Sequence, residues 1–264
     1  MNQSKKVPVQ EWLELARTAA LEAGAAILQV YASDDVGATL KADASPLTLA
    51  DQAAHRVIVQ YLTTTHIPIL SEEGQHTGFE ERKRWTWYWL IDPLDGTKEF
   101  LKRNGEFTVN IALMYQAIPV GGVVYSPVLD TLYLGSKETG THKEEKGQRT
   151  TLQPLPERVR VASLLQKPEV TVVASRSHMT QQTEDFINQF HQARLTTMGS
   201  SLKLMLLAER KADIYPRFAP TAEWDTAAAH AILRAVNRGI YQTDLQTELV
   251  YNKADLLNPS FVAF

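Results

Sequence analysis

Hydrophobic residues recur at helical spacing over two stretches near the N-terminus. From Gln10 to Tyr31 the apolar side chains return at the interval of a helix turn, which predicts an amphipathic helix. The polar segment 43–46 interrupts this pattern with an aspartate and a proline. The same spacing resumes from Leu47 to Leu62 and predicts a second helix, with one apolar face to bury against another layer.

The middle of the chain has the pattern of β-strands. A short apolar run at 69–70 and a longer one at 87–91 both lead into acidic residues. Further alternating runs, separated by turn residues, predict a meander at 108–115, 120–125 and 131–134. We expect the polar, glycine-containing segment 142–150 to be a solvated turn.

The order of predicted elements changes after segment 152–156, which contains two prolines. This segment is the best candidate for a domain boundary. We therefore divide the chain into subdomains 1–155 and 156–264. The second subdomain alternates strands with helices, which favours an α/β layer arrangement after an α+β N-terminal part. The expected strands are 170–174, 195–198 and 212–215, and the expected helices are 181–192, 200–210 and 224–236.

Composition excludes several classes of protein. The 264 residues are 44% hydrophobic and 22% charged, as in ordinary globular proteins. A net charge of −3 argues against a nucleic-acid binder, which would normally be basic. The absence of cysteine removes disulfides, thiolate nucleophiles and zinc–cysteine sites. No run approaches the ~18 apolar residues of a membrane span, and no signal-peptide core follows the N-terminus. Because the absence of cysteine suits the cytoplasm, we expect a cytoplasmic protein.

The segment after the strand at 87–91 carries the most specific chemistry. Proline lacks an N–H group, so strand pairing is expected to stop at Pro93, and the turn can bring Asp92 and Asp95 together. Two adjacent aspartates repel each other unless they share a proton or bind a hard cation. Gly96 and Thr97 offer backbone N–H groups to a phosphate oxygen. The alternative is a surface turn in which Asp-Gly supplies only turn chemistry.

Further acidic residues are placed to join this turn. Glu72 also follows an apolar run, and Asp225 and Asp51 each lie in the first turn of an expected helix. Glu72, Asp92, Asp95 and Asp225 would together carry about four negative charges, which two Mg²⁺ would cancel before a phosphate dianion could enter. Taken alone, Asp225 is also explained as an ordinary acid at a helix N-terminus.

These motifs, in their order and spacing, resemble those of the inositol monophosphatase family. The residues that carry the likeness are 72–73, 92–97 and 224–228, and it covers nearly the whole chain. Members of the family are magnesium-dependent, lithium-sensitive phosphomonoesterases. The resemblance implies a layered α-β-α-β-α sugar-phosphatase-like architecture, with a metal-binding subdomain at 1–155, a substrate-binding subdomain at 156–264 and the active site between them.

Within the family, the segment Lys98 to Phe107 resembles the branch that hydrolyses adenosine 3′,5′-bisphosphate. The segments 175–178, 199–203 and 215–218 also resemble that branch, and their cationic and hydroxyl side chains suit a second phosphate and a nucleobase. The implied reaction is removal of the 3′-phosphate to give AMP, which links the protein to sulfate assimilation. The alternative is an inositol monophosphatase-type sugar phosphatase.

The resemblance also implies roles for individual residues. Glu72, Asp92 and the carbonyl of Leu94 would hold one Mg²⁺, and Asp92, Asp95 and Asp225 a second, with a weaker third ion near Glu72. Thr97, aligned by Asp51, would help to deprotonate a metal-bound water, and Glu72 belongs with these two catalytic residues. The implied substrate-binding residues are Glu72, Leu94, Asp95, Gly96, Thr97, His178, Ser200, Lys203, Arg217 and Asp225. Lys41 is either a supporting cation or a solvated lysine.

Two other functions stay open at this point. A haloacid-dehalogenase-type phosphatase also places aspartate and Gly-Thr after a strand, but it spaces its two aspartates i, i+2, whereas Asp92 and Asp95 are i, i+3. A non-catalytic metal or phosphate sensor on the same fold is not excluded. The expected partner is a small-molecule nucleotide bisphosphate and not a nucleic acid. A monomer and a homodimer are both open, as is peripheral association with the inner membrane, although no amphipathic anchor is evident.

Overall fold

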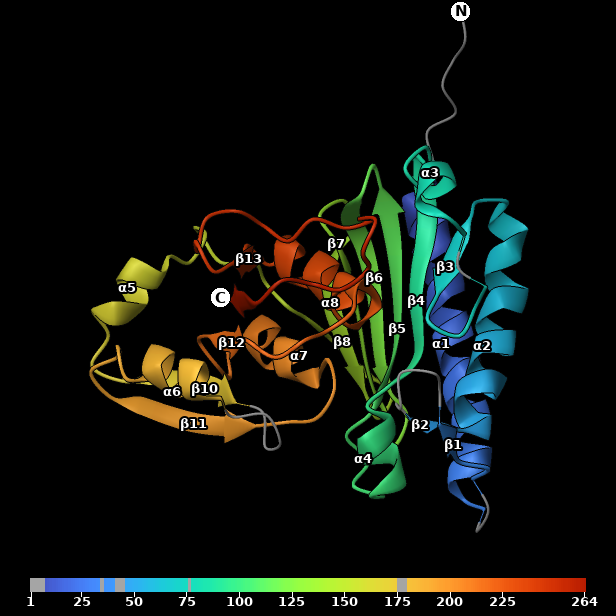
Figure 1. Ribbon diagram of the computed structural model, residues 1–264, viewed down its shortest axis with the longest axis horizontal. Coiled ribbons are helices and arrows are strands. Elements are labelled where there is room, and N and C mark those ends of the chain that lie inside the picture. Colours follow the sequence, from blue (N-terminus) through green and yellow to red (C-terminus); the bar gives the residue numbers. More distant parts are fainter. Residues whose placement is uncertain (1–7, 34–35, 41–45, 76, 175–179) are drawn as a thin grey trace, which may run out of the picture.

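The chain folds into alternating layers of helix and sheet, which Figure 1 shows side by side. The computed structural model describes residues 8–33, 36–40, 46–75, 77–174 and 180–264. The expected α-β-α-β-α layering is confirmed. From one side to the other, the layers are helices α1 (Val9–Tyr31) and α2 (Leu49–Leu62), a large sheet, helices α7 (Leu202–Ala208) and α8 (Glu223–Ala235), several short strands, and helices α5 (Val161–Leu165) and α6 (Gln181–Ile187).

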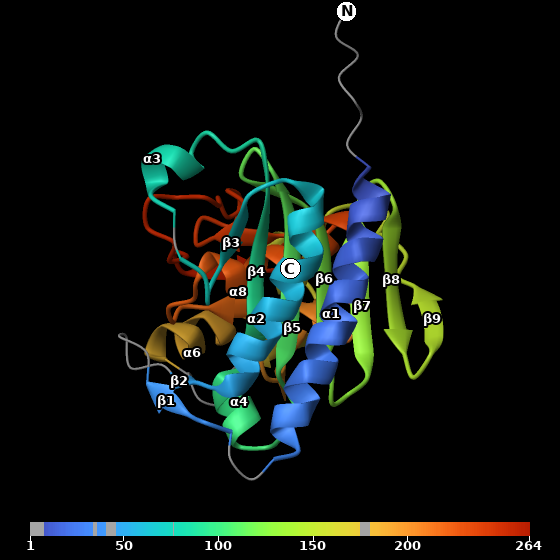
Figure 2. The same ribbon diagram turned by 90° about the vertical axis from the view of Figure 1, so that its right-hand side faces the viewer.

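The large sheet has seven strands in the order β3-β4-β5-β6-β7-β8-β9. β3 and β4 run parallel, and every other neighbouring pair is antiparallel. Figure 2 shows α1 and α2 lying across one face of this sheet. The strands are β3 (Ile69–Ser71), β4 (Trp87–Asp95), β5 (Thr108–Tyr115), β6 (Ile118–Ser126), β7 (Thr131–Ser136), β8 (Gly140–Glu145) and β9 (Gln148–Thr151).

Helix α8 packs on the opposite face of the sheet, and a glycine permits its close approach. A Cβ atom added at Gly122, on β6, would lie 2.1 Å from the carbonyl oxygen of Ala228 on α8. Alanines make up much of the buried face of α8, which also keeps the helix near the strands. This contact matters for function because the first turn of α8 carries Asp225.

The prediction for segment 142–150 is wrong. It forms most of a hairpin, β8 and β9, instead of a solvated turn. The chain reverses at Lys146 and Gly147, both with positive φ. β9 is the last strand of the sheet and its residues are exposed, so its sequence is polar and lacks the apolar alternation of a half-buried strand.

The expectation that pairing stops at Pro93 is wrong as well. β4 continues to Asp95, and only its register with β5 shifts between Asp92 and Asp95. Proline is tolerated in a sheet where such a bulge removes the need for its N–H group. The bulge leaves Asp92 opposite Asn110 and Asp95 opposite Thr108.

The remaining strands lie in the C-terminal part. The helix expected at 181–192 ends earlier, at Ile187, and the strand expected at 212–215 is found at 215–217. Short elements that the pattern did not predict include α3 (Phe79–Arg82) and α4 (Thr97–Leu101). The other strands are β1 (Thr39–Leu40), β2 (Pro46–Leu47), β10 (Val170–Ala174), β11 (Ala193–Thr197), β12 (Tyr215–Arg217), β13 (Ile240–Gln242) and β14 (Phe261–Ala263).

Within the residues that the structure describes, buried apolar side chains form three clusters. One lies between α1, α2 and the large sheet, one between the sheet and α7 and α8, and one within the C-terminal part. The second cluster joins residues from both sides of the expected boundary, such as Tyr88 and Leu204. The division at residues 155 and 156 stays a prediction. In the described part of the chain, no helix combines the length and apolar character needed to cross a membrane.

Candidate active site

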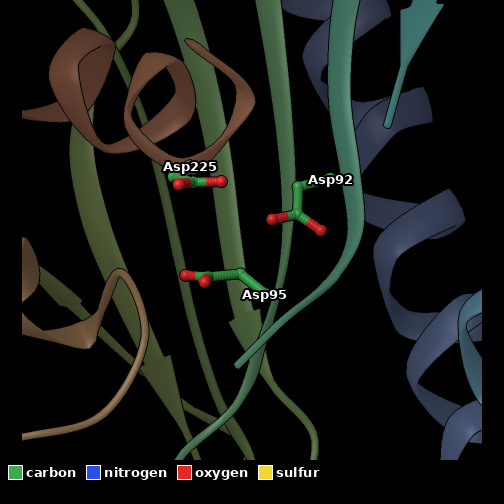
Figure 3. A group of neighbouring side chains, drawn as sticks. All are labelled: Asp92, Asp95 and Asp225. Carbon is green, nitrogen blue, oxygen red and sulfur yellow. The ribbon is translucent and has the colours of Figure 1, made fainter. Parts of the chain in front are cut away.

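Three aspartates from two distant parts of the chain meet beside the large sheet (Figure 3). Asp92 and Asp95 come from the bulged end of β4, and Asp225 comes from the first turn of α8. Each offers a carboxylate oxygen, and these three oxygens lie within 4.8 Å of one another. The sequence motifs at 92–95 and 224–225 therefore converge, as expected.

Glu72 joins the aspartates through the parallel pairing of β3 and β4. Ser71 is paired with Ile91, and the N–H of Glu72 donates to the carbonyl of Ile91 at 3.2 Å. Glu72, which follows β3, and Asp92, which lies within β4, are hydrogen-bonded through their carboxyl groups. Four carboxyl groups are thus gathered at one edge of the sheet.

Burial and mutual repulsion act on these acids. Burial raises the pKa of Asp92 well above its usual value, and the negative charges of Glu72, Asp95 and Asp225 raise it further. Burial also raises the pKa of Asp225, and the negative charge of Asp95 raises it further by a smaller amount. Either a proton or a cation must therefore offset the charge of the group.

Each aspartate uses one carboxylate oxygen to accept a backbone N–H. Leu94 donates to Oδ1 of Asp92 at 3.0 Å, Ala222 to Oδ2 of Asp225 at 2.9 Å, and Ser201 to Oδ2 of Asp95 at 2.7 Å. Such bonds fix the orientation of each carboxylate and leave its second oxygen for another ligand. The donor set is made only of oxygen, which fits Mg²⁺ and similar hard cations.

Thr97 and Asp51 also lie together. The hydroxyl of Thr97 is 3.5 Å from Oδ1 of Asp51 and 3.5 Å from the carbonyl oxygen of Leu94. The other oxygen of Asp51 accepts from the backbone N–H and the hydroxyl of Thr48, at 2.7 and 2.6 Å. Asp51 thus belongs to the capping box of α2, and the cap holds it in place beside Thr97.

The turn into α4 requires a glycine. Gly96 has φ 93°, in the left-handed region that a side chain makes unfavourable. This conformation ends β4 and begins α4 at Thr97, so the threonine hydroxyl lies near both Leu94 and Asp51.

A cavity of about 180 Å³ opens next to the aspartates. Its walls come from β4, α4, α7, α8 and β12, and they include both acidic and cationic side chains. Of the residues predicted to bind substrate, it is lined by Asp95, Gly96, Ser200, Lys203, Arg217 and Asp225. His178 and Lys41 lie outside the described residues.

Among the described residues, three cations, Lys98, Lys203 and Arg217, line this cavity, and the last two make long hydrogen bonds to backbone carbonyls. Lys203 Nζ donates to the carbonyl of Met198 at 3.3 Å, and Arg217 donates to the carbonyl of Pro220 at 3.4 Å. Burial lowers the pKa of Lys203, while the charge of Asp95 opposes this and that of Arg217 adds to it. Within the described residues, Nε of Arg217 is buried and has no hydrogen-bond partner. Both side chains are therefore available to an anionic ligand.

The sequence analysis included Ser201 only as part of segment 199–203, and it did not identify Thr108 or Asn110 as site residues. Ser201 reaches Asp95 through its backbone N–H, which no side-chain motif reveals. Thr108 and Asn110 are polar residues at alternate positions of an otherwise apolar strand, β5. That alternation is a readable signal, because both side chains then lie on one face of the sheet.

Comparison with known proteins places these features in a family. The model of the "Inositol monophosphatase family" matches residues 8–263. The chain is 46% identical, over 252 residues, to the 3′(2′),5′-bisphosphate nucleotidase CysQ of Salmonella typhimurium, which covers 94% of this chain and 98% of the relative.

Solved structures agree with this likeness. The crystal structure of CysQ from Bacteroides thetaiotaomicron superposes with a TM-score of 0.82, at 44% sequence identity, and covers 98% of each chain. The extragenic suppressor protein suhB from Bartonella henselae superposes with a TM-score of 0.73, covering 96% of this chain and 93% of its own. Its identity is only 21%, so it supports the fold alone.

Proposed function

Since this chain belongs to the inositol monophosphatase family, we propose that it hydrolyses the 3′-phosphate of adenosine 3′,5′-bisphosphate, with Mg²⁺, to AMP and phosphate. The observation that carries the proposal is the group of buried Asp92 and partly buried Asp95 and Asp225, beside a cavity that Lys203 and Arg217 line. The relatives that are named 3′(2′),5′-bisphosphate nucleotidase are similar to this chain over almost its full length.

The acids supply a binding site for two Mg²⁺ ions. Glu72, Asp92 and the carbonyl of Leu94 would hold one ion, and Asp92, Asp95 and Asp225 the other, with a weaker third ion near Glu72. When bound, Mg²⁺ supplies the positive charge that admits a phosphate dianion and the Lewis acidity that activates water and the leaving oxygen. The non-catalytic alternative gives no role to the contact between the hydroxyl of Thr97 and Oδ1 of Asp51.

The proton of the attacking water needs an acceptor. Thr97 and Asp51 fill this role in the proposal, because the Thr97 hydroxyl can pass a proton to the buried Asp51 carboxylate. Thr48 donates two hydrogen bonds to that carboxylate and so keeps one oxygen directed at Thr97. The backbone N–H groups of Gly96 and Thr97 would hold the transferred phosphate.

The second phosphate of the substrate would bind the cations of the cavity. Lys203 and Arg217 lie on different elements, α7 and β12, and both line the space next to Asp225. A phosphate with two negative charges would satisfy the buried Nε of Arg217 and form a charge-assisted bond with Lys203. Ser200 and His178 complete the proposed set. An inositol monophosphate has no second phosphate for these groups.

Phosphate release from three substrates, measured side by side with Mg²⁺, tests the proposal. We expect the highest kcat/KM for adenosine 3′,5′-bisphosphate, compared with inositol 1-phosphate and fructose 1,6-bisphosphate. Equal or higher kcat/KM for inositol 1-phosphate would favour the sugar-phosphatase alternative. No release from any of them would favour a non-catalytic sensor.

Asp92→Asn is the matched variant for this assay. It preserves the volume of the side chain and removes a charge that repels Glu72, Asp95 and Asp225, so we expect it to fold. Turnover should fall by more than the ~100-fold that loss of an outer-shell partner can cause. Retained Mg²⁺-dependent turnover would contradict the assignment of Asp92 as a ligand.

A further inference from the structure

Asp95 differs from the other two aspartates in the origin of its backbone donor. The donor to Asp92 lies two residues further along the chain, and the donor to Asp225 lies three residues before it. The donor to Asp95 is Ser201, 106 residues away. Asp92 and Asp225 are therefore oriented by their own segments, whereas the orientation of Asp95 depends on contacts between distant parts of the chain.

The 199–201 turn supplies two donors to the same oxygen. The hydroxyl of Ser200 lies 2.5 Å from Oδ2 of Asp95, and the N–H of Ser201 lies 2.7 Å from it. Ser200 has φ 52°, a left-handed conformation that is strained for a residue with a side chain. A Cβ added at Gly199 would be 2.4 Å from the carbonyl oxygen of Glu106, so the turn lies tightly against the start of β5.

Two polar residues of β5 form hydrogen bonds with this turn. Thr108 and Asn110 are almost fully buried on the same face of the strand. The hydroxyl of Thr108 lies 2.5 Å from that of Ser200 and 2.9 Å from that of Ser201. Ser201 donates its hydroxyl to Oδ1 of Asn110 at 2.8 Å. The amide nitrogen of Asn110 is 3.5 Å from Oδ2 of Asp95.

The hydrogens of these groups can be placed in one arrangement, in which the single hydroxyl hydrogen of Thr108 goes to Ser200 at 2.5 Å and not to Oδ1 of Asn110 at 3.1 Å. Ser200 donates to Asp95, so its oxygen is free to accept from Thr108. Ser201 donates to Asn110, and Asn110 directs its NH₂ group at Asp95. Two buried chains of hydrogen bonds thus end on the same carboxylate oxygen, and bonds in such chains strengthen one another.

We propose that Thr108, Asn110 and Ser201 are positioning residues for Asp95. They hold Oδ2 against the 199–201 turn, which leaves Oδ1 for the cation shared with Asp92 and Asp225. This inference rests on the proposed function, since it assumes that a cation binds here. It also explains why polar side chains are buried on β5 at the two positions opposite Asp92 and Asp95.

Substitutions at Thr108 separate positioning from general packing. Thr108→Val removes the hydroxyl and keeps the shape of the side chain, whereas Thr108→Ser keeps the hydroxyl. Thr141→Val is a matched control, because Thr141 is a buried threonine of the same sheet and its hydroxyl has no partner within the described residues. Ser201→Ala is a second test, which keeps the backbone N–H and removes the hydroxyl that contacts both Asn110 and Thr108.

Mn²⁺ binding to the purified proteins, followed by electron paramagnetic resonance without substrate, is the readout. Mn²⁺ prefers the same oxygen ligands as Mg²⁺. We expect Thr108→Val and Ser201→Ala to raise the dissociation constant of one bound Mn²⁺ ion by ~10–100-fold, the range seen on loss of outer-shell partners. Thr108→Ser and Thr141→Val should match the wild type, and the Mg²⁺ concentration needed for half-maximal turnover should shift in parallel.

The Mn²⁺ measurements distinguish a failure of the positioning inference from a failure of the proposed function. If the wild type binds Mn²⁺ and hydrolyses the nucleotide while both Thr108→Val and Ser201→Ala bind Mn²⁺ as it does, the positioning inference is wrong and the proposed function stands. If Thr141→Val weakens Mn²⁺ binding as much as Thr108→Val, the effect is one of packing and the inference is again wrong. If the wild type neither binds Mn²⁺ nor releases phosphate, the proposed function fails and the inference with it.

Discussion

At the scale of single residues, the candidate site depends on how each carboxylate divides its two oxygens. Asp92, Asp95 and Asp225 each give one oxygen to a backbone N–H, and Asp51 gives one to the cap of α2. One carboxylate oxygen from each of Asp92, Asp95 and Asp225 lies within 4.8 Å of the others beside the sheet, whereas Asp51 directs its second oxygen at Thr97. Because burial and repulsion raise the pKa of Asp92 and of Asp225, the metal-free group stores unfavourable charge that a cation relieves.

Arg217→Ala should change the choice of substrate more than the chemistry. The variant removes a cation that we assign to the second phosphate, so kcat/KM for adenosine 3′,5′-bisphosphate should fall by ~10-fold or more, the equivalent of one charge-assisted hydrogen bond. The value for inositol 1-phosphate should change much less. An equal fall in kcat/KM for both substrates, measured as phosphate release, would show that Arg217 does not bind the second phosphate.

Some site residues could be predicted because their side chains stand at recognisable positions in the sequence pattern. Asp92 and Asp95 stand at the end of an apolar strand, and Asp225 opens a helix, so their positions could be predicted. The pattern did not identify the role of Ser201, whose contribution is a backbone N–H fixed by the conformation of Ser200. The roles of the predicted site residues stay predictions.

At the scale of secondary structure, the strongly periodic elements were predicted and the weakly periodic ones were not. The helix from Val9 to Tyr31 differs by one residue from its expected start. The hairpin of β8 and β9 was missed because an edge strand exposed along its whole length needs no apolar alternation. The continuation of β4 past Pro93 was missed because a bulge cannot be read from a proline alone.

Gly122→Ala should test whether the close packing of α8 places Asp225. The added Cβ would lie 2.1 Å from the carbonyl oxygen of Ala228, so α8 must move. We expect a loss of about 1–3 kcal/mol in the free energy of unfolding, as for overpacked cores, together with weaker Mg²⁺-dependent activity. Urea denaturation and the Mg²⁺ dependence of turnover are the measurements.

Gly78→Ala is the control for this substitution, because nothing lies within 4 Å of an added Cβ there. Its free energy of unfolding should stay within about 0.5 kcal/mol of the wild type. If Gly122→Ala matched this control in both stability and Mg²⁺ dependence, α8 would not need its close contact with β6.

At the scale of the whole molecule, buried polar groups connect the layers and make stability depend on pH. His230, on α8, is fully buried. The N–H of Ile240 donates to its Nε2 at 3.4 Å, and its Nδ1 lies 3.0 Å from the hydroxyl of Tyr251. Both contacts suit a neutral ring that carries its hydrogen on Nδ1.

Acid should therefore destabilise the fold through His230. Burial, with the charges of Arg234 and Arg158, lowers its pKa from 6.5 to about 3. Below pH 6.5 the unfolded chain binds a proton that the folded chain does not, so stability falls as the pH drops from 6.5 towards 3, by at most ~1.4 kcal/mol per pH unit from this residue.

Urea denaturation measures this effect. The free energy of unfolding is determined at roughly evenly spaced pH values between about 7 and 4, a range that includes the unperturbed pKa of histidine. His230→Gln should show a shallower loss of stability with acid than the wild type, even if it is less stable at pH 7. His191→Gln, at an exposed histidine, should follow the wild-type profile. Parallel profiles for the wild type and His230→Gln would remove His230 as a cause of acid sensitivity.

We propose that the carboxylate group and the cationic cavity together direct water to the 3′-phosphate of a nucleotide bisphosphate. The most direct test is to incubate the wild-type protein with Mg²⁺ and adenosine 3′,5′-bisphosphate and to identify the product by ³¹P NMR. We predict that 5′-AMP and inorganic phosphate appear together, at a rate that Asp92→Asn abolishes. Formation of 3′-AMP, or an unchanged substrate, would contradict the claim.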